Sequence, residues 1–261
     1  KNMSVLIGDI GNTVTKICYL KNKNYKLKKI LYFESKDIRV KSILKKKFKK
    51  IINNKSNTKI AFFSSVVPKY TLILKSFLKK NYNINLTEVK SKKINKIIKI
   101  QIKNKKQVGS DRIANAVGVY KKYKNNCIVL DFGTATTFDV ITKEGVYKGG
   151  VIAPGVNLSI KSLTSSADQI PFFSIKKQKK IIGKNTIEAL RSGFYWGYTG
   201  LINNIILKIE QETKKKYKII FTGGYANLFK TSIIRSFVVD KNITIKGIIE
   251  IFKKNESSLI K

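Results

Sequence analysis

The sequence predicts an α/β protein built from two related halves. Short apolar strands alternate with helical segments along the 261 residues, a pattern typical of sheets covered by helices. A strand, an Asp-x-Gly turn and a second strand occur around Asp9 and again around Asp131, 122 residues later. Because the strands match on both sides of the two turns, duplication explains them better than the chance recurrence of a common turn. The predicted domains are residues 1–122 and 123–261.

The first half is expected to open with a β-hairpin, because Gly11-Asn12 separates two short β-branched segments. Pro68 is favoured at the first position of a helix, and Ser110 or Asp111 is a suitable N-cap for another. The lysine- and isoleucine-rich segment 90–106 is expected to be a loop or an irregular edge. The expected strands are 4–10, 14–20, 25–33 and 60–67, and the expected helices are 40–52, 68–81 and 112–124.

The second half is expected to repeat the strand, turn and strand arrangement. Gly149-Gly150 and Pro154-Gly155 indicate turns. Gly223-Gly224 follows a strand and precedes a short helix, where it either lets a flat nucleobase approach the backbone or makes a tight turn. The expected strands are 127–132, 136–142 and 219–222, with one more nearer the C-terminus, and the expected helices are 156–163, 185–212 and 245–253.

The composition is strongly basic, with 54 Lys and Arg residues against 15 Asp and Glu and a net charge of +39. Lysines can neutralise nucleic-acid phosphates, but these lysines are spread along the chain, and an A- and T-rich genome would produce them without a partner. We therefore expect no specific nucleic-acid partner. No apolar run is long enough to cross a membrane, and the N-terminal one is too short for a signal peptide. A cytoplasmic protein with no membrane partner is expected, and Cys18 and Cys127 are expected to be buried thiols.

The two Asp-x-Gly hairpins have the chemistry needed to hold a polyphosphate. Glycine lets the backbone approach a ligand, and successive turn amides can form an anion-binding nest. The hydroxyls of Thr13 and Thr134 can donate to phosphate oxygens, and Asp9 and Asp131 can hold cations directly or through water. The sequence contains no Walker loop and no Gly-x-Gly-x-x-Gly fingerprint.

A third motif, Gly109-Ser110-Asp111-Arg112, lies at an expected helix N-terminus, a position that favours anions. Arg112 can form paired hydrogen bonds with a carboxylate or phosphate, and Asp111 can accept a proton from an attacking hydroxyl. When the motif is taken alone, a capping aspartate beside a surface arginine is the preferred interpretation.

Together these motifs resemble, in order and spacing, those of the type III pantothenate kinases. The resemblance rests on residues 9–13, 109–112 and 131–139, and the segments 149–155, 185–186 and 222–224 are similar to the same family. It runs from about residue 5 to residue 253. It implies two duplicated actin-like (ribonuclease H-like) domains with a central cleft, in the superfamily of acetate and sugar kinases, heat-shock chaperones and actin. The implied activity is ATP-dependent phosphorylation of pantothenate to 4′-phosphopantothenate, the first step of coenzyme A biosynthesis.

The resemblance also implies roles for individual residues. Asp111 would be the proton acceptor, Asp131 would bind a monovalent cation, K⁺ or NH₄⁺, and the Mg²⁺ that accompanies ATP would lie near Asp9, through water. Family members are homodimers, and the tyrosine that they usually have before the third motif is replaced here by Ile102. The implied ATP-binding residues are Asp9, Ile10, Gly11, Asn12, Thr13, Val14, Thr15, Lys16 and Thr134. The implied pantothenate-binding residues are Gly109, Ser110, Asp111, Arg112 and Thr186.

Two other functions stay open on the sequence alone. One is another small-molecule kinase of the same superfamily, acting on a sugar or an acyl group. The other is a non-catalytic accessory protein that binds nucleic acid, which would show tight, saturable binding with a steep salt dependence.

Overall fold

The computed structural model describes residues 4–21, 25, 27, 29–52, 58–91, 94, 96–230 and 234–259. The chain forms two compact units. The first comprises Lys1–Tyr123, Gly145–Tyr147 and Asn242–Lys261, and the second comprises Lys124–Glu144 and Lys148–Lys241. The boundary after Tyr123 lies one residue from the expected one. The C-terminal segment, which the sequence analysis assigned to the second half, instead belongs to the first unit because its helix packs there.

The first unit contains a five-stranded sheet of order β3-β2-β1-β4-β5. The expected hairpin is confirmed, since β1 and β2 pair antiparallel, while β4 runs parallel to β1 and to β5. The strands are β1 (Ser4–Ile10), β2 (Val14–Lys21), β3 (Ile30–Glu34), β4 (Ile60–Ser65) and β5 (Asn85–Glu88). The helices are α1 (Lys41–Lys49), α2 (Pro68–Tyr82), α3 (Ser110–Tyr123) and α7 (Ile243–Leu259), with short 3₁₀ turns η1 (Ser35–Arg39), η2 (Val89–Ser91) and η3 (Lys105–Gln107).

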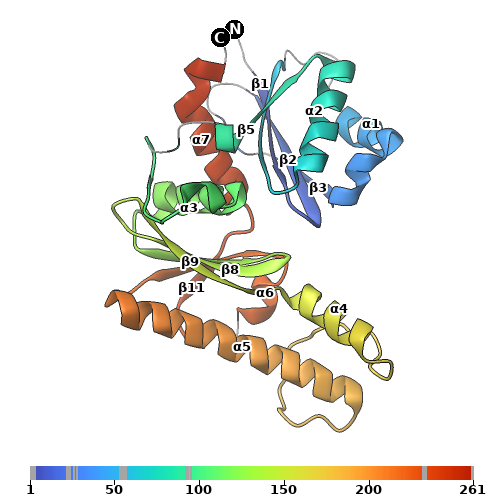
Figure 1. Ribbon diagram of the computed structural model, residues 1–261, viewed down its shortest axis with the longest axis vertical. Helices are drawn as coiled ribbons and strands as arrows, with labels where there is room; N and C mark the ends of the chain where they lie inside the picture. The colour runs from blue at the N-terminus through green and yellow to red at the C-terminus, as the bar shows by residue number, and fades with distance from the viewer. Residues whose placement is uncertain are drawn as a thin grey trace. The chain divides into compact units, whose positions relative to one another are not determined.

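The two faces of this sheet carry different residues because side chains alternate along a strand. Leu6 and Ile10 point into an apolar cluster with α1 and α2, which lie on one side of the sheet, opposite α7 (Figure 1). Asp9 is adjacent to Ile10 in β1, so its side chain points to the other face of the sheet. Helices α3 and α7 cover that face through their contacts with β1 and β4. The Phe62 and Phe252 rings meet there, 5.8 Å apart.

Helices α3 and α7 approach so closely that two glycines are required. A Cβ on Gly247 would overlap the carbonyl oxygen of Ala114, and a Cβ on Gly118 would lie 2.6 Å from the carbonyl oxygen of Ile243. Real Cβ atoms do not come this close to backbone. This contact is the physical reason why the C-terminal helix belongs to the first unit.

The second unit contains strands in the order β11-β10-β7-β8-β9. A further strand, β6 (Lys99–Ile100), pairs with Val146 and Tyr147 of β9, the two β9 residues that belong to the first unit. The strands are β7 (Cys127–Phe132), β8 (Ala135–Ile141), β9 (Val146–Pro154), β10 (Lys218–Gly223) and β11 (Phe237–Val239). The helices are α4 (Val156–Ser166), α5 (Thr186–Thr213) and α6 (Ala226–Phe229).

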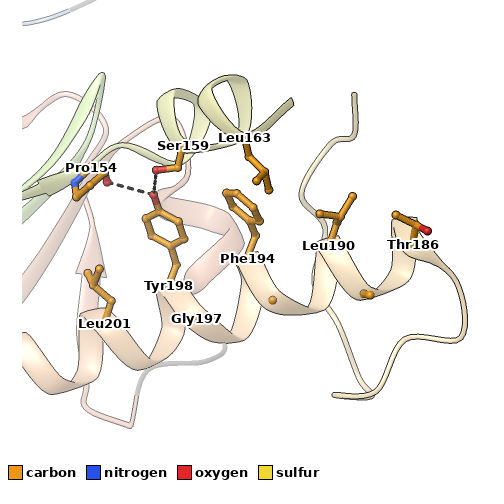
Figure 2. A pocket seen from close by; sticks show the side chains of 11 residues that line it. Pro154, Ser159, Leu163, Thr186, Leu190, Phe194, Gly197, Tyr198 and Leu201 are labelled. Carbon is orange, nitrogen blue, oxygen red and sulfur yellow. Dashed lines mark hydrogen bonds between the residues drawn. The ribbon is translucent and has the colours of Figure 1, made fainter. Parts of the chain in front are cut away.

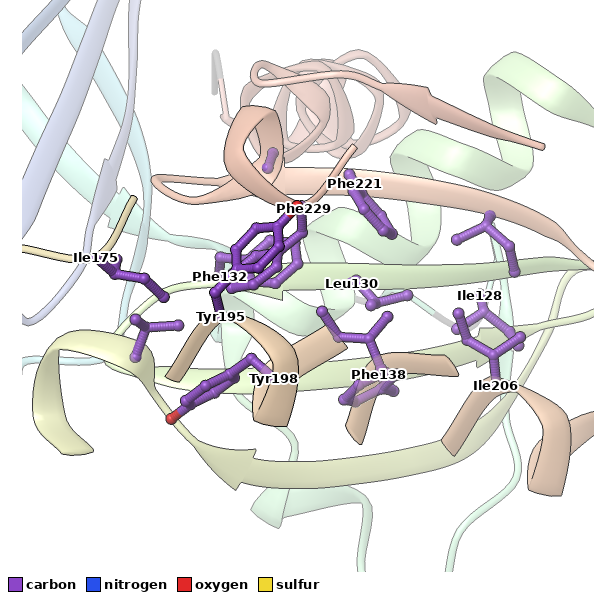
Figure 3. Close-up of a cluster of buried hydrophobic side chains, with 14 of the residues drawn as sticks. Ile128, Leu130, Phe132, Phe138, Ile175, Tyr195, Tyr198, Ile206, Phe221 and Phe229 are labelled. Atoms are coloured by element: carbon purple, nitrogen blue, oxygen red, sulfur yellow. The ribbon is translucent and has the colours of Figure 1, made fainter. Parts of the chain in front are cut away.

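Aromatic rings dominate the core of the second unit. Phe132 stacks on Phe229 with ring centres 5.5 Å apart, and Tyr195 stacks on the same ring at 6.0 Å (Figure 3). Ile128 and Leu130 belong to the same cluster. Alternation along β7 therefore places Asp131 on the opposite face of the sheet, away from this apolar core.

Several sequence expectations need correction. Strand β5 was not expected, and the predicted turn at Gly149-Gly150 is wrong, because both residues lie inside β9. Gly149 has φ of 110°, so a glycine marks an irregular strand residue here rather than a turn. The strand expected at 25–33 begins at Ile30, and residues 26 and 28 of that range lie outside the described residues. The loop expected at 90–106 contains the two-residue β6, and residues 92, 93 and 95 are likewise not described.

Both cysteines are free and buried, as predicted. Burial raises the pKa of each thiol to about 12, so both remain protonated and unreactive at neutral pH. No helix among the described residues is long and apolar enough to cross a membrane.

The close contact between α3 and α7 gives a stability prediction. Replacing Gly247 with Ala should lower the free energy of unfolding by about 1–3 kcal/mol, because overpacking outweighs the better helix propensity of alanine. Chemical denaturation monitored by circular dichroism measures this change. Gly200→Ala in α5 is the matched control, since nothing lies within 4 Å of its added Cβ, and it should leave stability unchanged or raise it by up to about 1 kcal/mol. Equal effects of the two substitutions would contradict the close contact.

Candidate active site

The first Asp-x-Gly hairpin is held firmly at its base. Asp9 is 7% exposed and lies opposite Lys16. The N–H of Gly11 donates to the carbonyl oxygen of Val14 at 3.1 Å, and the Ser35 hydroxyl donates to the carbonyl oxygen of Gly11 at 2.6 Å. Because the Ser35 hydroxyl has donated its one proton to Gly11, it can only accept from Thr15, whose hydroxyl donates to Ser35 Oγ at 2.8 Å. The turn is therefore fixed from the η1 side.

The tip of the hairpin is open while its base is packed. Asn12, Thr13 and Val14 are exposed, so a ligand can approach the turn, where Asn12 and Thr13 carry polar side chains. Ile10 lies in the apolar core and the Thr15 hydroxyl is bonded to Ser35, so these two predicted ATP-binding residues can contribute only through the backbone or by shaping the turn. Sequence reasoning missed Ser35, since a single serine 24 residues beyond the turn carries no local signal.

The Gly109 to Arg112 motif forms the start of α3, two residues earlier than predicted. The N–H of Ile113 donates to the carbonyl oxygen of Gly109 at 3.1 Å, so Gly109 occupies the capping position and Ser110 lies inside the helix. The Arg112 N–H donates to Asp111 Oδ1 at 2.8 Å. A Cβ on Gly109 would overlap that same oxygen, so the absence of a side chain there makes room for the carboxylate.

The expected capping role of Ser110 is wrong, because its hydroxyl points to β4 instead. It donates to the carbonyl oxygen of Ser65 at 2.8 Å and accepts from the Ser65 N–H at 3.0 Å. It also lies 3.0 Å from Ser64 Oγ. In the sheet register, Ser64 is directly opposite Asp9. The structure thus connects the Asp9 hairpin and the Asp111 motif within the first unit.

The second Asp-x-Gly hairpin, in the second unit, has a similar local geometry. The N–H of Gly133 donates to the carbonyl oxygen of Ala135 at 3.1 Å. Asp131 lies between Thr137 of β8 and Thr222 of β10 in the register of the sheet. Since neighbouring residues in register share a face, three oxygen-bearing side chains lie together on the face away from the aromatic core.

Two further glycines allow neighbouring backbone segments to pack closely against this hairpin. A Cβ on Gly155 would overlap the carbonyl group of Thr134, so α4 begins directly against the turn. Gly223 has φ of 85°, and a Cβ there would lie 2.6 Å from the carbonyl oxygen of Phe132. The N–H of Gly224 donates to that oxygen at 3.0 Å. These contacts form the tight turn expected at Gly223-Gly224, and the approach of a nucleobase to it stays a prediction.

Thr186 is the first residue of α5 and lines an apolar groove of about 630 Å³ between α4 and α5 (Figure 2). Asn185 caps the helix, with its side-chain oxygen accepting from the Glu188 N–H at 2.9 Å. Tyr198 also lines the groove, and its hydroxyl lies 2.8 Å from Ser159 Oγ and donates to the carbonyl oxygen of Pro154 at 3.2 Å.

Within the described part of the chain, no group of three or more His, Cys, Asp or Glu residues could hold a metal ion by itself. A metal bound by these described residues would therefore have at most two such ligands, together with neutral oxygens, water or a bound molecule. This donor set suits Mg²⁺ bound to a nucleotide, or a monovalent ion.

Comparisons with known proteins identify the family of the chain. The family model described as type III pantothenate kinase matches residues 5–208. The type III pantothenate kinase of Pelagibacter ubique (strain HTCC1062) is 50% identical over 246 residues, which are 94% of this chain and 97% of that protein.

Solved structures show the fold. A Campylobacter jejuni protein named for the Baf family of transcriptional activators has a TM-score of 0.62 and 22% identity, covering 97% of this chain and 99% of that one. An archaeal actin homolog solved with ADP has a TM-score of 0.50 and 12% identity, covering 96% and 99%. The duplicated actin-like fold is confirmed, and by its sequence the chain belongs to the type III pantothenate kinase family.

Proposed function

We propose that this chain phosphorylates pantothenate with ATP, yielding 4′-phosphopantothenate and ADP in the first step of coenzyme A biosynthesis, and that Asp111 orients the attacking hydroxyl. The activity follows from membership of the family. The hydroxyl oxygen attacks the γ-phosphorus, the bond to the β,γ-bridging oxygen breaks, and the hydroxyl proton passes to the Asp111 carboxylate. ATP and coenzyme A precursors are cytoplasmic metabolites, so we place the reaction in the cytoplasm.

The position of Asp111 supports this role. Its carboxylate is at the N-terminus of α3, where the helix dipole favours negative charge, and one oxygen is held by the Arg112 N–H. Phosphoryl transfer has a loose transition state, so orienting the hydroxyl contributes more than early removal of its proton. Arg112 and Gly109 belong to the same turn, and the guanidinium is suited to the carboxylate of pantothenate. Thr186 is the remaining proposed substrate residue.

The Asp9 hairpin is proposed to bind the ATP phosphates. Its tip, Asn12 to Val14, is exposed, and its base is already fixed by the Ser35 hydrogen bond to the Gly11 carbonyl oxygen, so the turn amides would bind phosphate without rearrangement of the base. Bound Mg²⁺ would neutralise charge on the transferring phosphate, and the largely buried Asp9 carboxylate is placed to hold it through water. Thr134 is proposed to contact ATP from the second hairpin.

Asp131 is proposed to hold a monovalent cation, K⁺ or NH₄⁺. Thr222 supports this assignment because its side chain is fully buried beside Asp131, yet its hydroxyl oxygen has no hydrogen-bond partner among the described residues. A buried, unsatisfied hydroxyl is costly, and a cation shared with the carboxylate would remove that cost.

We also propose that the protein is a homodimer. The α4–α5 groove is lined largely by apolar residues, and Gly193 and Gly197 of α5, which line it, have no neighbouring atom within 4 Å of an added Cβ. Phe172 and Ile182 of the preceding segment are 74% and 73% exposed. An apolar surface of this kind is typical of a site covered by a partner.

The activity predicts ADP release that requires both pantothenate and Mg-ATP, measurable in a coupled assay. Asp111→Asn should lower kcat by at least about 100-fold, the effect expected for loss of a positioned proton acceptor. Glu212→Gln removes an exposed carboxylate at the C-terminal end of α5 and should leave kcat unchanged. Near-normal turnover in Asp111→Asn would show that another group orients the hydroxyl.

The cation proposal predicts faster turnover in potassium than in sodium buffer, together with a higher melting temperature in potassium. Asp131→Asn should abolish both differences. Thr222→Val has nearly the same shape but lacks the hydroxyl oxygen, and it should reduce the potassium-dependent rise in melting temperature. A rise that survives in both variants would place the ion elsewhere.

The dimer proposal predicts a solution mass of twice the 29.7 kDa of one chain in sedimentation equilibrium. Gly197→Arg introduces a long charged side chain into the groove and should shift the mass to that of a single chain. Lys208→Arg, further along α5, is the matched control and should remain dimeric. A wild-type mass of one chain at micromolar concentration would exclude a stable dimer.

A further inference from the structure

We infer that Ser64 is a positioning residue for the phosphoryl transfer, because its hydroxyl locks the first turn of α3, and hence Asp111, to the strand pair that carries Asp9. This inference rests on the proposed function and extends it to a residue that lies outside the recognised motifs, 46 positions before Ser110.

The direction of the Ser64 hydrogen bond follows from counting protons. A serine hydroxyl has one proton to donate and two lone pairs to accept. The Ser110 proton is donated to the carbonyl oxygen of Ser65, and one lone pair accepts the Ser65 N–H. The remaining lone pair can take only a donor, so the Ser64 hydroxyl donates to Ser110 Oγ at 3.0 Å. Ser110 is then fully satisfied.

Both hydroxyls are buried in the first unit. Ser64 is 0% and Ser110 is 1% exposed, so water does not substitute readily if either hydroxyl is removed. Ser64 belongs to β4, which pairs with β1 and places Ser64 opposite Asp9. The hydrogen bond therefore runs from the strand that flanks the proposed phosphate-binding hairpin to the residue directly before Asp111.

The hydrogen bond between Ser64 and Ser110 restrains the distance between Asp111 and the Asp9 hairpin. Asp111 must orient a hydroxyl toward a phosphate held at the Asp9 hairpin, and displacements of about 1 Å can cost up to about 100-fold in rate. The two Ser65 backbone contacts keep α3 docked without Ser64. Loss of the Ser64 hydroxyl would thus loosen the first turn while leaving the fold intact.

The test compares the wild-type protein with Ser64→Ala in the pantothenate-dependent ADP-release assay at saturating Mg-ATP. We expect kcat to fall about fivefold to tenfold, corresponding to the loss of one buried hydrogen bond, while KM for ATP stays within about twofold. Ser64→Cys keeps the size of the side chain but donates more weakly, so its kcat should lie between those of the wild type and Ser64→Ala. It also serves as the second variant should Ser64→Ala not fold.

The matched control is Ser4→Ala. Ser4 Oγ lies 2.8 Å from Thr58 Oγ1, in another buried hydroxyl pair that joins the opposite end of β1 to the chain entering β4. Removal of the Ser4 hydroxyl should lower the melting temperature about as much as Ser64→Ala does, without changing kcat. A double-mutant cycle adds a second readout, since Ser64→Ala should have little further effect on kcat in a Ser110→Ala background.

Unchanged kcat in both Ser64→Ala and Ser64→Cys, with melting temperatures lowered as in Ser4→Ala, would overturn the inference and leave Ser64 a purely structural residue. Full additivity with Ser110→Ala would also overturn it. Absence of pantothenate-dependent ADP release from the folded wild-type protein would instead refute the proposed function, and the inference with it.

Discussion

The close packing of α3 against α7 is the contact on which the first unit depends. Gly118 and Gly247 let the two backbones approach within a distance that any side chain would prevent. The paired helices cover the face of the sheet that carries Asp9, and α3 begins with the turn that carries Asp111. Residues from the end of the chain thus support a helix whose N-terminus lies beside a hairpin from its beginning.

The two hairpins show how similar turns are stabilised differently. In the first, the turn is held from outside by the Ser35 hydroxyl, which bonds to the Gly11 carbonyl oxygen. In the second, backbone packs directly on backbone, since Gly155 and Gly223 each leave no room for a Cβ. Both solutions fix the turn before a ligand arrives, which is the condition under which backbone amides stabilise developing charge most effectively.

The sequence predicted what depends on neighbouring residues and missed what depends on distant ones. The hairpin around Gly11 and the helix opened by Pro68 follow from local turn and capping chemistry, and both are confirmed. The Gly149-Gly150 turn was wrong because glycine also occurs inside irregular strands. The Ser64 to Ser110 bond and the Ala114 to Gly247 contact join residues far apart in the chain, and no local pattern distinguishes a serine or glycine that has such a partner.

The acidic residues show where the structure requires a negative charge. Only 15 occur beside 54 basic residues, yet Asp9 and Asp131 are the last but one residues of equivalent strands and Asp111 lies in the first turn of α3. Glu210 has a side chain that is 5% exposed and is paired with Arg235 at 2.6 Å, and with Lys216 at 3.6 Å. Burying a carboxylate is costly unless it is paired, hydrogen-bonded or bound to a metal, and no lysine can hold a cation or accept a proton from a hydroxyl while it is protonated. In a chain this basic, the carboxylates at strand ends and helix starts therefore identify the chemistry more specifically than the surface charge does, since that charge attracts any polyanion, ATP included.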